Sequence, residues 1–188
     1  ELILRPMYKD IAPYDPQGIL QDEWLNSRGA IARFERNAIE IRVIDIQECI
    51  ASDIAVNTAL ISALRSLAQE QWCSCIEQRA LDQKELVSIF HSCIKDGDQA
   101  IISSNEYHKA FAINSQTPLT AGKLWNYLTT QLIPADDPSW HALRVIVNQG
   151  CLARRMIASV GRLPTTESIH VLCRQLAACL ASSEAFSV

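Results

Sequence analysis

The side chains best suited to chemistry occur on a short β-forming segment. Glu40 and Arg42 are two residues apart, so on a strand they point to the same face. A carboxylate there can ligate Mg²⁺, which prefers oxygen ligands, while a guanidinium group can hold two phosphate oxygens. Arg33, on the preceding segment, would add positive charge near a transferring phosphoryl group. The pattern is consistent with nucleotide binding.

The same residues have a simpler interpretation, in which Arg33 and Glu40 form an ion pair across two strands on a solvated sheet face. Spacing alone favours this structural interpretation, because Glu-x-Arg is a very common tripeptide. A second candidate site is the segment 26–29, where Arg28 can meet an anion and Gly29 permits close backbone approach. An ordinary loop-to-strand transition is the alternative there.

Asp45 and Glu48 follow the charged segment and extend a carboxylate cluster with Glu40 if the chain bends. Asp45 lies at odd spacing from Glu40, so on a regular strand it points to the opposite face. The predicted carboxylate site therefore rests mainly on Glu40.

Other signals are weak. The histidines lack metal-ligand spacing, and we expect each of them to be at the surface or partly buried: His91, His108, His141 and His170. The seven cysteines contain no Cys-x-x-Cys pair, and we expect most to be small buried side chains in a reducing compartment. A basic patch of Arg144, Arg154, Arg155 and Arg162 is best explained as a solvated face or an interdomain contact.

A β-hairpin between residues 29 and 45 must position Glu40 and Arg42. Arg36 and Asn37 suit a two-residue turn, which places Arg33 opposite Glu40 and Ile31 opposite Arg42. The other face of the hairpin is then apolar and is expected to face a core. That face contains Ala30, Ala32, Phe34, Ile39, Ile41 and Val43.

The remaining sequence is helical in pattern. We expect a helix from about 53 to 78, with an apolar stripe of Val56, Leu60, Ala63, Leu64 and Leu67. Further helices are expected after the caps Asp82, Thr120, Asp137 and Thr165 or Thr166. The helix after Asp137 is expected to run through Gly150 to Gly161. The chain thus divides into a hairpin and loop part, residues 1–50, and a helical bundle, residues 51–188.

Composition limits the class of protein. The chain has 188 residues, 48% of them hydrophobic, and a formal net charge of −4, which fits a globular protein and argues against a generic nucleic-acid binder. No apolar run of membrane-spanning length is expected, because charges such as Arg65 interrupt the longest stretches. The expected location is the cytoplasm, without membrane or nucleic-acid partners.

Two segments resemble a known family. They are Asn26-Ser27-Arg28-Gly29-Ala30-Ile31-Ala32-Arg33-Phe34 and Ala38-Ile39-Glu40-Ile41-Arg42-Val43-Ile44-Asp45-Ile46-Gln47-Glu48-Cys49. They look like the second glutamate–cysteine ligase family, a group of carboxylate–amine ligases. The resemblance extends to Arg5-Pro6, to the segment 12–16, to the segment 150–157 and to Cys179-Leu180 near the end.

The resemblance implies an α+β chain: part of a glutamine-synthetase-like antiparallel sheet, followed by a mainly helical part. It implies that ATP and Mg²⁺ convert a substrate carboxylate into an acyl phosphate, which an amine attacks to give an amide. It assigns metal binding to Glu40 and nucleotide-phosphate binding to Arg42, with Arg33 and Arg28 nearby. The substrates would be amino acids, and a homo-oligomer is possible for this class.

The chain resembles only the C-terminal half of such a ligase. The remaining metal ligands would come from the other half, so the 188-residue chain is expected to be inactive alone. Two alternatives stay open. One is a non-catalytic helical interaction or dimerisation module that keeps the ligase scaffold, and the other is a glutamine-synthetase-like enzyme that phosphorylates a guanidino or amine substrate.

Overall fold

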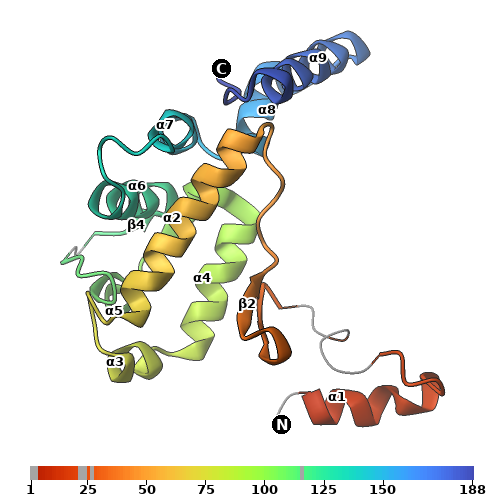
Figure 1. Cartoon of the computed structure of the whole chain (residues 1–188), viewed down its shortest axis with the longest axis vertical. Coiled ribbons are helices and arrows are strands. Elements are labelled where there is room, and N and C mark those ends of the chain that lie inside the picture. Colours follow the sequence, from red (N-terminus) through yellow and green to blue (C-terminus); the bar gives the residue numbers. More distant parts are fainter. Residues whose placement is uncertain (1–3, 21–24, 26–27, 115–116) are drawn as a thin grey trace. The chain divides into compact units, whose positions relative to one another are not determined.

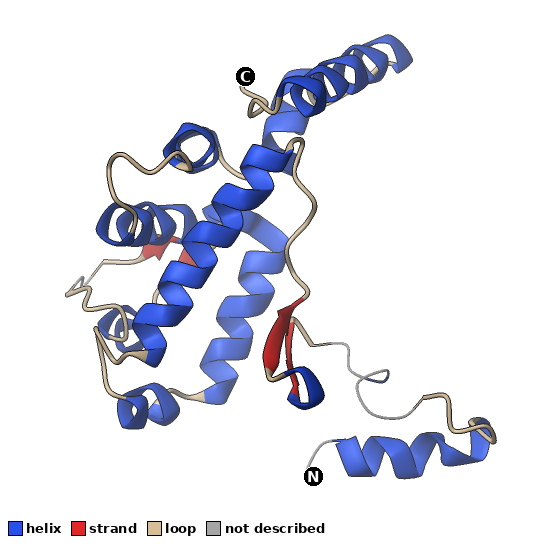
Figure 2. Cartoon of the chain, in the orientation of Figure 1, coloured by secondary structure: helices blue, strands red, loops and turns tan. Residues whose placement is uncertain are grey.

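The computed structural model describes residues 4–20, 25, 28–114 and 117–188, and it divides into two compact units, residues 1–45 and 46–188 (Figure 1). Helices predominate, and the described strands form two small antiparallel sheets of two strands each (Figure 2). The predicted α+β class is confirmed at this level, but β strands also occur among the later helices, at residues 101–102 and 119–120.

The first unit contains a helix that the sequence did not predict. The described elements of this unit are α1 (Leu4–Ile11), η1 (Ala12–Tyr14), β1 (Ala30–Arg33), η3 (Phe34–Arg36) and β2 (Ala38–Ile41). The helix that was not predicted is α1. Pro6 lies in the first turn of α1, where its missing N–H costs no helical hydrogen bond. The predicted turn near Asp15 is confirmed, because Gly18 N–H donates to the Asp15 carbonyl at 3.1 Å. The expected helical turn at 21–25 lies almost entirely outside the described residues.

The second unit begins with α2 (Ile50–Ala68), α3 (Cys75–Ala80) and α4 (Gln83–Asp96), followed by η4 (Gly97–Gln99), β3 (Ile101–Ile102), α5 (Asn105–Lys109) and β4 (Leu119–Thr120). It ends with α6 (Ala121–Leu132), α7 (Trp140–Gln149), α8 (Leu152–Val160) and α9 (Thr166–Ser182). The predicted caps Asp82, Thr120 and Thr165 each accept a backbone N–H through a side-chain oxygen. These three helix starts are confirmed.

Two predicted helices are wrong in extent. The helix expected to reach residue 78 ends at Ala68, and α3 begins after a capping box formed by Ser74 and Glu77. The helix expected to run through Gly150 is divided there into α7 and α8. Gly150 has φ 90°, and an added Cβ would lie 2.9 Å from both Arg154 Cδ and Asp98 Oδ1, so the break depends on glycine.

The buried face of α2 differs from the predicted Leu and Val stripe. Its fully buried residues are small: Ser52, Ala55, Ala59, Ala63 and Ser66. This face packs on α6 and α7, and small side chains let helix axes approach closely. Val56, Leu60 and Leu67 are half-buried and Leu64 is exposed. Of the predicted stripe, Ala63 is buried as expected. The larger members are less buried because α6 and α7 pack closely on the alanine and serine side.

Helix α2 also corrects the expectation that no stretch reaches membrane-spanning length. Among the described residues it is long and apolar enough to cross a bilayer by length and composition, with only Asp53 and Arg65 charged over 19 residues. Only 28% of its apolar window is buried. Its alanine and serine face packs within the second unit, while large apolar side chains such as Ile54 and Ile61 are exposed.

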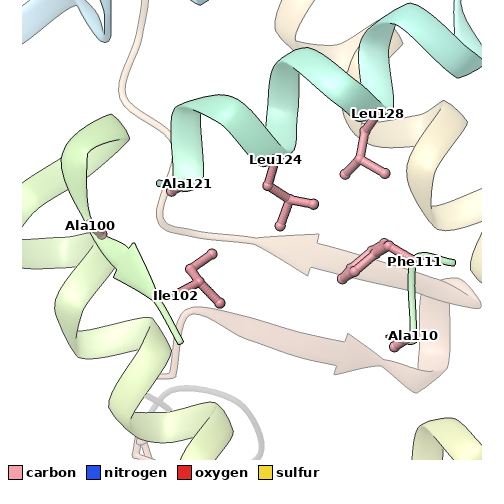
Figure 3. Close-up of a cluster of buried hydrophobic side chains, with 7 residues drawn as sticks. All are labelled: Ala100, Ile102, Ala110, Phe111, Ala121, Leu124 and Leu128. Carbon is pink, nitrogen blue, oxygen red and sulfur yellow. The ribbon is translucent and has the colours of Figure 1, made fainter. Parts of the chain in front are cut away.

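A buried apolar cluster joins β3, the residues that directly follow α5, and α6. It consists of Ala100, Ile102, Ala110, Phe111, Ala121, Leu124 and Leu128. Figure 3 shows Leu124 and Leu128 of α6 pointing toward Ile102 and Phe111. Phe111 also contacts Trp72, with ring centroids 5.5 Å apart. Burial of this kind is the main favourable contribution to the folding of the helical unit.

The cysteines contradict the expectation that most are buried. All seven are free thiols, and Cys49 alone is fully buried. Cys75, Cys151 and Cys173 are exposed, and the remaining three are half-buried. The expectation failed because α3, α8 and α9 each bury at most a narrow side of their surface. A cysteine with apolar neighbours in the sequence can therefore lie on the exposed side of its helix.

Candidate functional site

The hairpin forms with a register different from the predicted one. Glu40 lies opposite Ile31, and Arg33 lies opposite Ala38. The predicted two-residue turn is replaced by η3 and by Asn37, whose φ is 48°. The longer turn shifts the pairing by two residues, so Arg33 and Glu40 are diagonal neighbours on one face instead of direct partners. An even shift keeps every side chain on its predicted face.

Glu40 forms ion pairs with both arginines of the candidate site. Its Oε2 accepts from Arg33 Nε at 2.5 Å, and its Oε1 accepts from Arg42 Nε at 2.8 Å. The side chains of Arg33, Glu40 and Arg42 are 15%, 34% and 31% exposed. Hydrogen bonds from Arg42 and then Arg33 lower the pKa of the Glu40 carboxyl. The predicted cross-strand pair is confirmed, and it extends to Arg42.

This cluster suits an anion better than a cation. Two guanidinium groups share one carboxylate, so the three side chains carry a net positive charge and guanidinium donors. Mg²⁺ needs several converging oxygen ligands, whereas both Glu40 oxygens already accept from arginine. Among the residues that the structure describes, no three His, Cys, Asp or Glu side chains lie together as a metal site. These residues alone therefore do not fit Mg²⁺.

Arg28 lies at the open end of the hairpin, near Arg42 in the strand pairing. Its neighbour Gly29 accepts a hydrogen bond from the Arg42 backbone N–H at 2.7 Å, which extends the ladder beyond β1. Arg28 is exposed. Asn26 and Ser27, from the same predicted segment, lie outside the described residues.

The apolar face of the hairpin is not buried as predicted. Ala30 and Ala32 are exposed, Ile39 is 65% exposed, and Val43 is 53% exposed. Ile31, on the charged face, is instead 4% exposed. The side chain of Phe34 is not among those described. Two short strands offer too little surface to bury an apolar face by themselves.

Glu48, expected as a possible member of a carboxylate cluster, is buried in the second unit and paired with Arg155, a partner that the sequence did not predict. The Glu48 and Arg155 side chains are both 0% exposed, and Arg155 Nη1 donates to Glu48 Oε1 at 2.9 Å. Ser52 Oγ also donates to this oxygen, at 3.3 Å. Burial favours a raised pKa for Glu48, but the hydrogen bond from Arg155 and bonds from backbone N–H groups outweigh it and lower the pKa. No local pattern links residues 107 positions apart.

The predicted basic patch is divided among separate contacts. Arg154 Nε donates to Asp98 Oδ1 at 2.8 Å, and Arg155 is buried against Glu48. Arg144 lies over the Trp140 ring, 6.0 Å from its centroid. Arg162 is exposed. The expected solvated face fits the exposed Arg144, Arg154 and Arg162. Arg155 contradicts it, because its side chain is buried against Glu48 within the second unit.

His108 corrects the expectation that the histidines are at the surface or partly buried. It is 1% exposed on α5, and neither ring nitrogen has a hydrogen-bond partner. The other three histidines are exposed, as expected: His91, His141 and His170. A helix of five residues gives too short an apolar pattern for sequence to predict this burial.

These features define the chain as an α+β protein that joins a charged β-hairpin unit to a helical unit. No protein-family model matches the chain, and no solved structure matches it. It is similar to an uncharacterized protein of Archaeoglobus fulgidus, with 26% identity over 171 residues. The match covers 89% of this chain and 39% of the relative, so the chain spans well under half the length of that relative.

Proposed function

We propose that this chain is part of an ATP-dependent carboxylate–amine ligase of the glutamate–cysteine ligase type. The observation that carries the proposal is the cluster of Arg33, Glu40 and Arg42 on one face of the antiparallel hairpin. In the family that the sequence resembles, the glutamate of a Glu-x-Arg strand binds Mg²⁺ and the arginine binds nucleotide phosphate. The proposed location is the cytoplasm, and the proposed substrates are a carboxylic acid and an amine of the amino-acid class.

The arginines are the proposed nucleotide-binding groups. Arg42 and Arg33 present guanidinium donors beside a shared carboxylate, and a phosphate can replace that carboxylate as the acceptor. Arg28 adds a third positive charge beside the ladder position of Gly29. Positive groups fixed near the transferring phosphoryl group stabilise its charge in the transition state. No side-chain nucleophile is needed, because the substrate carboxylate attacks the phosphorus.

Glu40 is the proposed contribution of this chain to a magnesium site. It supplies one carboxylate, and the other oxygen ligands would come from sequence outside the 188 residues. The chemistry that bound Mg²⁺ supplies in such ligases is neutralisation of phosphate charge. In this proposal a phosphate takes the place of Glu40 as an acceptor of one arginine while Glu40 turns to the metal, so the two proposed roles are compatible.

The exposed apolar face of the hairpin supports a larger sheet, which we propose to be glutamine-synthetase-like. Ile39 and Val43 are more than half exposed, and two strands rarely persist alone in water. The matched relative has additional sequence that can supply further strands, since this chain covers 39% of it. In this proposal both units form one half of a larger catalytic domain.

The test compares this chain with the full-length gene product. The full-length protein should form ADP only when a carboxylic acid and an amine substrate are both supplied with Mg²⁺–ATP. By calorimetric titration, the 188-residue chain alone should bind Mg²⁺–ATP no more tightly than about millimolar, a free energy of about −4 kcal/mol. ADP formation with no dependence on any acid and amine pair would contradict the proposal.

A second candidate is a non-catalytic helical interaction module, and one surface favours it. Helix α9 has an exposed apolar side that includes Ile169, Cys173 and Leu180, whereas Leu172 alone is fully buried on it. Such a side is typical of helices that meet another helix. Sedimentation of the chain with and without Leu180→Glu, beside a nucleotide-binding assay, separates the two candidates.

A further inference from the structure

The last residues of the chain lie against a buried charged pair in the second unit. Glu48 precedes α2, and Arg155 lies on α8. Arg155 Nη2 also approaches Glu48 Oε2 at 3.5 Å, and Arg155 Nε donates to the Gly150 carbonyl at 3.2 Å. The pair is thus fixed in orientation, with polar atoms directed at residue 186.

Both backbone polar groups of Phe186 bind this pair. Its N–H donates to Glu48 Oε1 at 2.8 Å, and its carbonyl accepts from Arg155 Nη1. The Phe186 side chain is 4% exposed. Glu48 accepts the N–H and Arg155 donates to the carbonyl of the same residue, so the pair recognises the Phe186 backbone at two points. The buried aromatic ring is the anchor.

Contacts on either side hold the rest of the segment. Ser183 Oγ accepts from Ala51 N–H at 3.3 Å, and Val188 N–H donates to Gln149 Oε1 at 2.9 Å. Ala185 packs against the buried cluster of α2 and α7 that includes Leu143. Residues 184–188 belong to no helix or strand, so side chains of other elements supply most of their binding.

We infer that Glu48 and Arg155 form a peptide-binding site for an extended segment with an aromatic side chain, and that residues 184–188 of the same chain occupy it as a tethered ligand. The segment follows Ser183, which ends α9 in the left-handed conformation with φ 58°. Tethering gives a short segment a high effective concentration at its site. This site is separate from the hairpin cluster and does not depend on the proposed ligase activity.

The first experiment measures amide hydrogen exchange in the intact chain. The Phe186 amide should exchange at least about tenfold more slowly than the same amide in the free hexapeptide 183–188, since a protection factor of ten corresponds to 1.4 kcal/mol. Exchange at the free-peptide rate in the intact chain would overturn the inference, whatever any variant does.

The second experiment asks whether the site accepts the segment in trans. A fluorescent hexapeptide with the sequence of residues 183–188 is titrated into the intact chain and into the Phe186→Ala and Ser187→Ala variants. The peptide should bind the Phe186→Ala chain at least about tenfold more tightly than the other two, in which the tethered segment keeps its anchor. Ser187 is exposed and serves as the matched control.

A peptide carrying alanine in place of the phenylalanine tests the anchor itself, and it should bind the Phe186→Ala chain at least about tenfold more weakly. Equal binding of both peptides, or no binding to a folded Phe186→Ala chain, would show that residues 184–188 only pack against the body. Circular dichroism establishes that the variant is folded. If it is not folded, the exchange rate of Phe186 in the intact chain decides.

Discussion

Replacing Glu48 by glutamine is expected to destabilise the helical unit strongly. The substitution keeps the size of the side chain but leaves the Arg155 guanidinium buried without a counter-charge, at 0% exposure. Breaking one partner of a buried ion pair typically costs about 3–5 kcal/mol. For a domain of this size each kcal/mol lowers Tm by about 2–4 °C, so we expect a fall in Tm of about 10 °C.

The pH dependence follows from the lowered pKa of Glu48. A carboxyl whose pKa is lower in the folded state binds fewer protons there than in the unfolded chain, so it stabilises the fold at pH above its unfolded pKa. That contribution is lost as the pH falls through the folded pKa, below the ordinary value of 4.5. The Tm difference between the parent and Glu48→Gln should therefore be largest near neutral pH and shrink below about pH 4.

The assay is thermal unfolding followed by circular dichroism from pH 7 to pH 3. The matched control is Glu167→Gln, because Glu167 pairs with Arg174 at 3.3 Å while both side chains are more than 60% exposed. The control should change stability by less than about 1 kcal/mol at every pH. A Glu48→Gln chain as stable as the control, or a Tm difference independent of pH, would refute the description of Glu48 and Arg155 as a buried pair that stabilises the fold.

Three further predictions concern the hairpin and one interhelical turn. Glu40→Gln in the full-length protein should lower ATP turnover at least about a hundredfold, and near-normal turnover at saturating Mg²⁺ would remove Glu40 from the proposed site. Arg42→Lys should impair the ATP-dependent step while changing stability by under about 1 kcal/mol, because lysine keeps the charge but lacks the planar pair of donors; a far lower Tm would make Arg42 structural. Gly150→Ala should cost more stability in urea unfolding than Gly161→Ala, by about 1–3 kcal/mol, since both have positive φ but nothing lies within 4 Å of a Cβ at Gly161; equal losses would contradict the steric argument.

Several helix starts and stops were predictable because their causes lie within one turn, although the end of α2 and the break at Gly150 were missed. Asp82, Thr120 and Thr165 each bind a backbone N–H three residues later. Gly97 and Gly161 end helices with positive φ, as expected of glycine at these positions. Such signals are local, so no knowledge of the surrounding fold is needed to use them.

Burial was less predictable, because it depends on what covers each face. The predicted stripe of α2 shares only Ala63 with the buried face, since α6 and α7 pack on the alanine and serine side. The partner of Glu48 was out of reach for the same reason: Arg155 is 107 residues away, and only the tertiary fold brings the two together. Periodicity shows which residues share a face of a helix or strand, but it does not show which face the rest of the protein covers.

The candidate site has one feature that the local sequence predicts and one that depends on the tertiary fold. Alternation of residues on the hairpin correctly placed Arg33, Glu40 and Arg42 on one face, and the even register shift preserved that result. The sequence did not show that Glu40 would hold both arginines at once. That contact depends on the turn of residues 34–37, which moved Arg33 to a diagonal position.

Two features of the hairpin are poorly explained by its own stability. Partly exposed ion pairs such as those of Glu40 contribute little to folding, and exposed Ile39 and Val43 on the opposite face contribute less than buried side chains would. A larger sheet packed on the apolar face would account for the second feature, and an anion bound by the arginines would account for the first. The ligase proposal requires both a larger sheet and a phosphate-bearing ligand, so both features are compatible with it. A hairpin that serves only to connect or decorate the helical unit requires neither.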